Sequence, residues 1–166
     1  IRLQGISKWV VITGTNGKST TTALTAHILK NAGKSVSVGG NLGTPMAELD
    51  SPGEIGIRVV ELSSYQLEIT PSLNPDVSAI LNLSPDHLDR HGSMENYAAA
   101  KAKAIKNVKS DGLIILGNNS NLLSLLPAKY TCSLCQIKEA DIPQEARKNI
   151  ALSGTHNAEN AAVATR

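Results

Sequence analysis

The segment from Val10 to Thr20 reads V-V-I-T-G-T-N-G-K-S-T, and it constrains the fold more than any other part of the chain. Its β-branched run predicts a buried strand over residues 8–13, followed by a glycine turn and a helix that begins at Ser19. The turn can point its backbone N–H groups inward, toward an anion at the positive end of the helix dipole. Lys18 adds a charge for the outer phosphates, and Ser19 or Thr20 offers a hydroxyl to the Mg²⁺ that accompanies ATP.

This segment therefore predicts a loop that binds the phosphates of a nucleotide. Its members are Gly14, Thr15, Asn16, Gly17, Lys18, Ser19 and Thr20. The common pattern G-x-x-x-x-G-K-[ST] would place a glycine at position 12, where this chain has Ile12, so the loop is a shortened variant. The alternative is an ordinary glycine turn between a strand and a helix that carries a lysine by chance.

Composition agrees with a single domain that buries its own core. The chain has 166 residues, of which 41% are hydrophobic, but only 2% are aromatic and none is Phe. The core must therefore be built from Val, Ile, Leu and Ala, which suits a parallel sheet covered by helices.

Charge and hydropathy exclude several classes of partner. A net charge of +2 is too small to indicate a nucleic-acid or membrane surface, so we expect no nucleic-acid partner. No apolar stretch approaches the ~20 residues of a membrane span, and the first residues lack the pattern of a signal peptide. We expect a cytoplasmic monomer with no membrane span.

Short apolar runs alternate with helical patterns along the chain, which is typical of repeated βαβ units. The predicted strands are 8–13, 35–38, 57–62, 77–83 and 112–116, and the predicted helices are 19–31, 94–107 with Ser93 as its cap, and a helix that starts near 156. Residues 118–149 are less regular. The sequence predicts an α/β fold with a mostly parallel sheet flanked by helices.

Polar segments follow the first four predicted strands. In an open α/β sheet, ligands bind beyond the carboxyl ends of the strands. The four segments are 14–19, 39–41, 61–64 and 84–91. We expect all of them to gather at one edge of the sheet.

Glu61 and His87 are candidate metal ligands within these segments. Glu61 directly follows an apolar strand, where a buried carboxylate is costly unless it meets a cation such as a Mg²⁺ bound by Ser19. The alternative is a solvated loop glutamate. His87 lies in S-P-D-H-L-D-R-H and can bind a metal while a carboxylate orients its second nitrogen, or it can be an ordinary surface histidine. Asp89 or Arg90 can equally form a weak surface ion pair.

Cys132 and Cys135 form a lone C-x-x-C motif. A zinc site needs a second pair of ligands at suitable spacing, and a redox motif should open a helix, whereas the flanks here look like a strand. We expect two reduced thiols with no chemical role.

Taken together, these motifs resemble the central ATP-binding domain of the Mur ligases, which build the peptide stem of bacterial peptidoglycan. The resemblance rests on residues 14–20, 40–41, 61–68, 82–91, 97–101 and 152–157. The string E-L-S-S-Y-Q-L-E at 61–68 is most similar to the branch of the family that adds D-glutamate.

The resemblance implies roles for individual residues. Lys18 would contact the ATP phosphates, and Ser19 and Glu61 would hold one Mg²⁺. Asn41 would help to position the phosphate and the substrate carboxylate, and His87 would bind a second Mg²⁺.

Three further roles are implied only by the resemblance. Lys101 would match the carbamylated lysine of the family, because a carbamate presents oxygens to Mg²⁺ where an ammonium would be repelled. Without the modification, Lys101 reads as one more exposed lysine on an alanine-rich helix. Asn157 and Asn160 would contact the adenine.

The implied reaction uses ATP, two Mg²⁺ ions, UDP-N-acetylmuramoyl-L-alanine and D-glutamate. A phosphoryl group passes to the alanyl carboxylate, and the amine of D-glutamate then displaces phosphate from the acyl phosphate. Alternatives are another Mur ligase, a folylpolyglutamate synthetase-like ligase, a small-molecule kinase and a non-catalytic nucleotide-binding module. A GTP-binding switch is disfavoured because the sequence lacks N-K-x-D.

The resemblance covers only part of a Mur ligase. Members of the family also have an N-terminal domain that binds the UDP moiety and a C-terminal domain that binds the amino acid, and neither is found in this sequence. Residues 118–150 look short for the domain as well. We therefore expect residues 1–166 to be a partial central domain that binds nucleotide weakly and forms no amide bond by itself.

Overall fold

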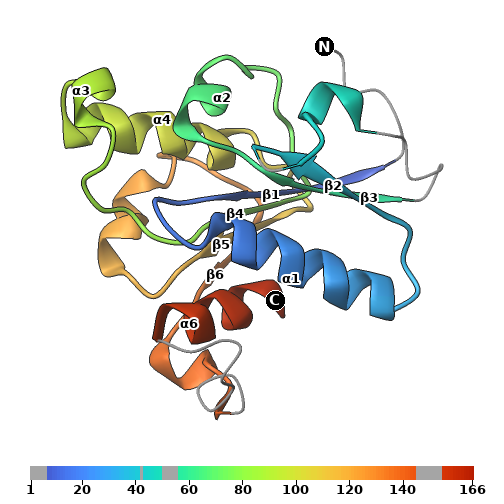
Figure 1. Ribbon diagram of the computed structural model, residues 1–166. Helices are drawn as coiled ribbons and strands as arrows, with labels where there is room; N and C mark the ends of the chain where they lie inside the picture. Colours follow the sequence, from blue (N-terminus) through green and yellow to red (C-terminus); the bar gives the residue numbers. More distant parts are fainter. Residues whose placement is uncertain (1–6, 42, 50–55, 145–154) are drawn as a thin grey trace.

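Six parallel strands form one sheet in the computed structural model, which describes residues 7–41, 43–49, 56–144 and 155–166 (Figure 1). The strands in chain order are β1 (Lys8–Thr13), β2 (Val36–Gly40), β3 (Ile57–Glu61), β4 (Val77–Ile80), β5 (Leu113–Leu116) and β6 (Ser133–Gln136). Their spatial order is β2-β3-β1-β4-β5-β6, and every neighbouring pair is parallel. The predicted α/β class with a mostly parallel sheet is confirmed.

Helices cover both faces of this sheet. The helices are α1 (Lys18–Asn31), α2 (Ser64–Glu68), α3 (Leu88–His91), α4 (Met94–Lys106) and α6 (Thr155–Ala164), and the short 3₁₀ turns are η1 (Met46–Glu48), η2 (Ser120–Leu125) and η3 (Glu139–Asp141). Figure 1 shows α1 and α6 on one face, with α2, α3 and α4 on the other. None of the helices in the described ranges is long and apolar enough to cross a membrane.

The core lies on both faces of the sheet because side chains alternate across each strand. Ile12 faces α1 and α6, where it packs in a cluster with small residues of α6 such as Ala158 and Ala162. The neighbouring Val11 faces the opposite side and packs with Leu67 of α2. Burial on both faces explains why the strands read as continuous apolar runs rather than as an alternation of apolar and polar residues.

Strand β1 lies inside the sheet, between β3 and β4. From β1 the chain first passes to β2 and β3 on one side and then crosses to β4 on the other. Because all strands are parallel, the segments after β1, β2, β3 and β4 leave the same edge of the sheet, as expected from the sequence. The reversal of direction at β1 creates the crevice in which such folds bind ligands.

The largest differences from the predicted strands lie at the ends of β2 and β4. Strand β2 continues through Gly39 and Gly40, and a side chain on Gly40 would meet the carbonyl oxygen of Glu61 at 2.1 Å, so glycine permits this close pairing. Strand β4 ends at Ile80 instead of residue 83. Beyond it, the carbonyl of Asn82 accepts a hydrogen bond from the loop amide of Thr15 rather than from a neighbouring strand.

The less regular part after β5 contains η2, β6 and η3. Cys132 lies in the core beneath α4, whereas Cys135 packs against the core on the α1 side, so the two free thiols lie in separate cores on opposite faces of the sheet. No group of three or more His, Cys, Asp or Glu side chains within the described ranges is arranged to hold a metal. That the two thiols have no chemical role stays a prediction. Residues 152–154, which contribute to the family resemblance, lie outside the described residues.

The central strands should carry most of the stability. Leu116 is fully buried at the end of β5, and Leu116→Ala should lower the free energy of unfolding by about 2–5 kcal/mol, because it removes apolar contacts and leaves a cavity. Leu123→Ala, at an exposed position of η2, is the matched control and should change it by less than about 1 kcal/mol. Urea unfolding followed by circular dichroism measures both. Equal losses in the two variants would contradict this description of the core.

Candidate functional site

The loop between β1 and α1 is built to receive an anion. Gly17 has a φ of 82°, a left-handed conformation that favours glycine, and it turns the chain into the first residue of α1. No side chain caps this end of α1 by a hydrogen bond, so amides of its first turn remain available for a ligand. The positive end of the helix dipole points in the same direction.

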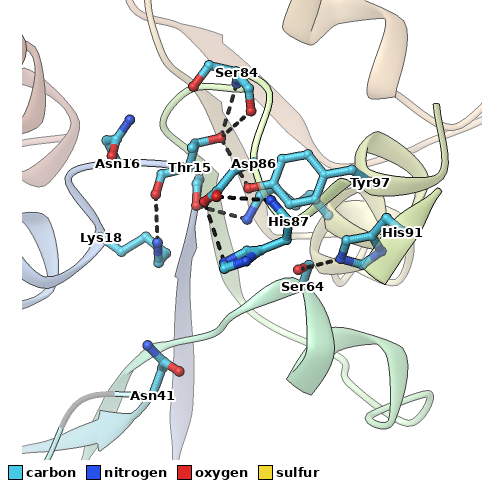
Figure 2. A network of polar contacts seen from close by, with 12 residues as sticks. Thr15, Asn16, Lys18, Asn41, Ser64, Ser84, Asp86, His87, His91 and Tyr97 are labelled. Atoms are coloured by element: carbon cyan, nitrogen blue, oxygen red, sulfur yellow. Dashed lines mark hydrogen bonds and ion pairs between the residues drawn. The ribbon is translucent and has the colours of Figure 1, made fainter. Parts of the chain in front are cut away.

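The segment that follows β4 holds the loop in place by hydrogen bonds. The hydroxyl of Thr15 donates to the carbonyl of Ser84 at 3.2 Å and accepts from the amide of Ser84 at 3.0 Å (Figure 2). It also lies 3.1 Å from the hydroxyl of Tyr97. Because the single hydroxyl hydrogen of Thr15 goes to the Ser84 carbonyl, the phenol of Tyr97 is the donor in this pair, and burial raises its pKa above the ordinary value. Asn16 and Asn82 exchange two further hydrogen bonds, between the amide and carbonyl of one backbone and the side chain of the other.

Lys18 lies at the start of α1 and folds back over the loop. Its Nζ donates to the carbonyl of Thr15 at 2.8 Å. The ammonium therefore lies over the loop and its amides, where phosphate oxygens could replace the carbonyl as its acceptor.

Glu61 is the most deeply buried acid of the site. It ends β3 with only 1% of its surface exposed, and it accepts hydrogen bonds from Ser19 Oγ at 2.7 Å and from Asn41 Nδ2 at 3.0 Å. The alternative of a solvated loop glutamate is therefore wrong. No ion pair within the described ranges involves Glu61, so both partners of this buried carboxylate are neutral. A carboxylate beside a serine hydroxyl is the hard oxygen environment that Mg²⁺ prefers, and the donor set thus fits that ion.

Lys101 is buried, so the alternative of an exposed lysine on α4 is also wrong. Only 2% of its surface is exposed, its Nζ donates to the carbonyl of Gly14 at 2.8 Å, and the same atom lies 4.7 Å from the ring centroid of Tyr97. Burial and the nearby charge of Lys18 lower the pKa of Lys101 to about 8, against a smaller opposing effect of Asp86. A substantial fraction of this amine is therefore neutral near pH 7.5.

His87 lies at the outer rim of the site. Its side chain is 50% exposed, its Nε2 lies 3.5 Å from Asp86 Oδ2, and its ring centroid lies 5.3 Å from that of Tyr65. Its backbone has a φ of 52°, a left-handed conformation that is uncommon for a side chain of this size. The structure records no contact between His87 and Glu61, so the two proposed metal ligands do not form a preassembled cluster. Nearby, Arg90 forms an exposed ion pair with Glu68 at 3.5 Å.

A cavity of about 560 Å³ lies beside the loop. The loop contributes Asn16, Gly17 and Thr20 to its wall, and α6 contributes His156, Asn157 and Asn160. Asn160 packs so closely on Gly17 that a Cβ there would lie 2.5 Å from its Oδ1. Amide side chains supply both donors and acceptors, which suits recognition of the edge of a base.

Several residues of the site received no individual role from the sequence. Tyr97 and Ser84 brace Thr15, Asn82 braces Asn16, and Asp86 lies near His87 and Lys101. All four lie inside segments that the motif comparison singled out. Their positions after β4 and on the first turn of α4 placed them near the site in the sequence. Their hydrogen-bond partners could not be predicted, because these depend on how α4 packs on the sheet.

Comparison with known proteins identifies the family of the chain. The model of the Mur ligase middle domain matches residues 12–145. A "UDP-N-acetylmuramoylalanine--D-glutamate ligase" of Nitrobacter winogradskyi is 40% identical over 182 aligned residues, which include 95% of this chain and 39% of that protein. The chain thus spans less than half the length of this relative.

Solved structures share the fold. A crystal structure of MurF from Acinetobacter baumannii superimposes with a TM-score of 0.73 at 22% identity, covering 96% of this chain and 42% of that one. MurF from Thermotoga maritima, solved in complex with ADP, matches with a TM-score of 0.64 at 26% identity over 78% of this chain and 32% of that one.

The burial of Lys101 predicts a specific dependence of stability on pH. The pKa of Lys101 is about 8 in the folded chain, against an ordinary value of 10.5 that applies to the unfolded chain. Between pH 8 and pH 10.5 the unfolded chain therefore binds more protons than the folded chain. Stability should therefore rise with pH through that window. Lys101→Met cannot titrate and should lack this contribution, which amounts to about 3 kcal/mol at most.

Urea unfolding at pH 7, 8, 9 and 10 tests this, with Lys103→Met at an exposed position of α4 as the control. The control should follow the wild type at every pH. Identical pH profiles for the wild type and Lys101→Met would show that the ammonium is not desolvated.

Proposed function

The chain belongs to the Mur ligase family through its middle domain, and from this membership we propose that it is the ATP-binding part of a ligase that joins D-glutamate to UDP-N-acetylmuramoyl-L-alanine. The observation that carries the proposal is the convergence of Lys18, Ser19, Asn41 and Glu61 at one edge of the sheet. This arrangement combines a phosphate loop with a buried carboxylate that can hold a metal ion. The name of the Nitrobacter relative supplies the two substrates.

The loop side of the site would bind the triphosphate. Lys18 would exchange the Thr15 carbonyl for phosphate oxygens, and the free amides of α1 would donate to the same group. The cavity beside Gly17 would take the adenosine, with Asn157 and Asn160 contacting the adenine. The Thermotoga relative that shares this fold was solved in complex with ADP, which supports an adenine nucleotide as the ligand.

The residues around Glu61 would hold the Mg²⁺ ions that neutralise the negative charge of the phosphates. Ser19 and Glu61 would hold one Mg²⁺, and His87, with Lys101 as a carbamate, would hold a second. Bound there, Mg²⁺ supplies Lewis-acid stabilisation of the transferring phosphoryl oxygens. Asn41 donates to Glu61 and would orient the carboxylate of the incoming substrate beside it.

Two successive transfers make up the proposed reaction. An oxygen of the alanyl carboxylate attacks the γ-phosphorus of ATP, which releases ADP and leaves an acyl phosphate. The amine of D-glutamate then attacks the acyl carbon, loses a proton and expels phosphate. Each step concentrates negative charge, which Lys18 and the loop amides stabilise more in the transition state than in the ground state.

The carbamate of Lys101 has a chemical basis in this chain. CO₂ adds to a neutral amine, and a pKa of about 8 leaves roughly a quarter of Lys101 neutral at pH 7.5, where an ordinary lysine is almost wholly charged. The addition releases one proton to solvent, and the carbamate nitrogen would keep one hydrogen, which can continue to donate to the Gly14 carbonyl. The buried position also shelters the product from water.

The substrate proposal is tested by phosphate release in the complete protein that carries this sequence. With ATP, Mg²⁺ and UDP-N-acetylmuramoyl-L-alanine, D-glutamate should stimulate release, whereas L-lysine and D-alanyl-D-alanine should not. Lys18→Ala should lower the rate by several orders of magnitude, because it removes a charge that stabilises the transition state. Lys30→Ala, at an exposed site near the end of the same helix, should retain normal activity.

Stimulation by another amino acid would reassign the substrate. Normal turnover of Lys18→Ala would remove that residue from the phosphate site.

The modification of Lys101 is tested by ¹³C nuclear magnetic resonance in the presence of ¹³C-bicarbonate. We expect one carbamate resonance that disappears in Lys101→Met and persists in Lys103→Met. Of these two lysines, Lys101 is the one that is buried and has a lowered pKa. A spectrum without any such resonance in the wild type would count against carbamylation, as would a resonance that survives Lys101→Met.

A further inference from the structure

His91 is a buried polar side chain that the proposed reaction does not use. It ends the short helix α3, and only 7% of its surface is exposed. Figure 2 shows its ring close to Ser64 and beside the ring of Tyr97. Burying an imidazole is unfavourable unless its nitrogens find partners, so the contacts that hold it are informative.

The contacts of His91 reach two other helices. Its Nε2 shares a hydrogen bond of 2.9 Å with Ser64 Oγ of α2, and its Nδ1 lies 3.8 Å from Glu68 Oε1 of the same helix. Its ring stacks on Tyr65 at 5.5 Å between centroids and 19° between planes. On α4, its ring meets that of Tyr97 at 5.2 Å and 52°. A ring held by a hydrogen bond at its edge and by aromatic neighbours has little freedom to rotate.

Each helix that His91 contacts is adjacent to one of the proposed metal ligands. Ser64 begins α2 three residues after Glu61. His87 precedes α3, and its carbonyl accepts from the amide of His91 at 3.0 Å, so the two histidines share one helical turn. Tyr97 lies one turn before Lys101 on α4, beneath the Lys101 ammonium.

We propose that His91 is a positioning residue that fixes Glu61, His87 and Lys101 relative to one another. The inference rests on the proposed function, because only there do these three residues serve as ligands of the two proposed Mg²⁺ ions. Three separate backbone segments must bring their ligands to within a few tenths of an ångström of the required places, and residues behind the ligands set that precision. His91 is placed to do this because it touches all three segments at once.

Two substitutions remove the contact from opposite sides. His91→Phe keeps an aromatic ring between Tyr65 and Tyr97 but removes the hydrogen bond to Ser64. Ser64→Ala removes the same hydrogen bond and keeps a small side chain in its buried place, so the fold should survive even if the histidine variant is poorly stable. His27→Phe, at an exposed position of α1, is the matched control.

The readout is the affinity for Mn²⁺, followed by the electron paramagnetic resonance of the free ion in the presence of a non-hydrolysable ATP analogue. His91→Phe and Ser64→Ala should each lower the affinity for Mn²⁺ about tenfold. The double variant should bind Mn²⁺ as tightly as the single variant with the lower affinity, because both substitutions remove the same hydrogen bond. Binding of the analogue without metal should stay within about twofold of the wild type, since the contacts of Lys18 and the loop are untouched. His27→Phe should match the wild type in both measurements.

A merely structural histidine gives a different result. If Ser64→Ala and His91→Phe bind Mn²⁺ as tightly as His27→Phe, the positioning role is overturned, whatever happens to their melting temperatures. A wild-type chain that shows no analogue-dependent Mn²⁺ binding would instead overturn the metal site of the proposed function.

Discussion

The carboxylate of Glu61 lies at the end of β3, an interior strand of the parallel sheet, and is almost entirely removed from water. A charge in that place needs polar partners, and the chain supplies them from the two segments that leave the sheet beside it. Ser19 comes from the start of α1, and Asn41 comes from the end of β2. The one acid thus ties the phosphate loop and two further strand ends into a single site.

Positive charge is arranged around the same edge but is not paired with that acid. Lys18 and Lys101 each donate to a carbonyl of the loop, and their mutual repulsion contributes to the lowered pKa of Lys101. Lys18 and a row of free amides on one side, with a buried carboxylate on the other, form a site that an anion and a divalent cation would together neutralise. A nucleotide triphosphate with Mg²⁺ has that combination of charges.

Much of this organisation could be predicted from the sequence, because it depends on local patterns. The strand at 8–13 and the helix that follows the loop were predicted almost to the residue, since glycine, lysine and hydroxyl positions mark the turn between them. The gathering of polar segments at one edge followed from the parallel sheet alone. Glu61 was recognised as a buried acid because an apolar strand leads directly into it.

Other features depend on packing and could not be predicted in the same way. The burial of Lys101 was missed, although Tyr97, Ala104 and Ile105 mark an apolar stripe on α4 that includes it, since lysine itself reads as exposed. Helices α2 and α3 are too short to show a helical period, so the packing of His91 of α3 against α2 had no signal in the sequence. The left-handed backbone of His87 likewise reflects the surrounding fold rather than its residue type.

The most direct test of this account is a crystal structure of the chain grown with Mn²⁺ and a non-hydrolysable ATP analogue, with anomalous scattering used to locate the metal. We expect a Mn²⁺ peak within about 2.0–2.4 Å of an oxygen of Glu61 and of Ser19 Oγ, with the phosphates of the analogue against Lys18. A bound analogue whose metal lies away from Glu61, with the hydrogen bonds of Ser19 and Asn41 to that carboxylate unchanged, would contradict it.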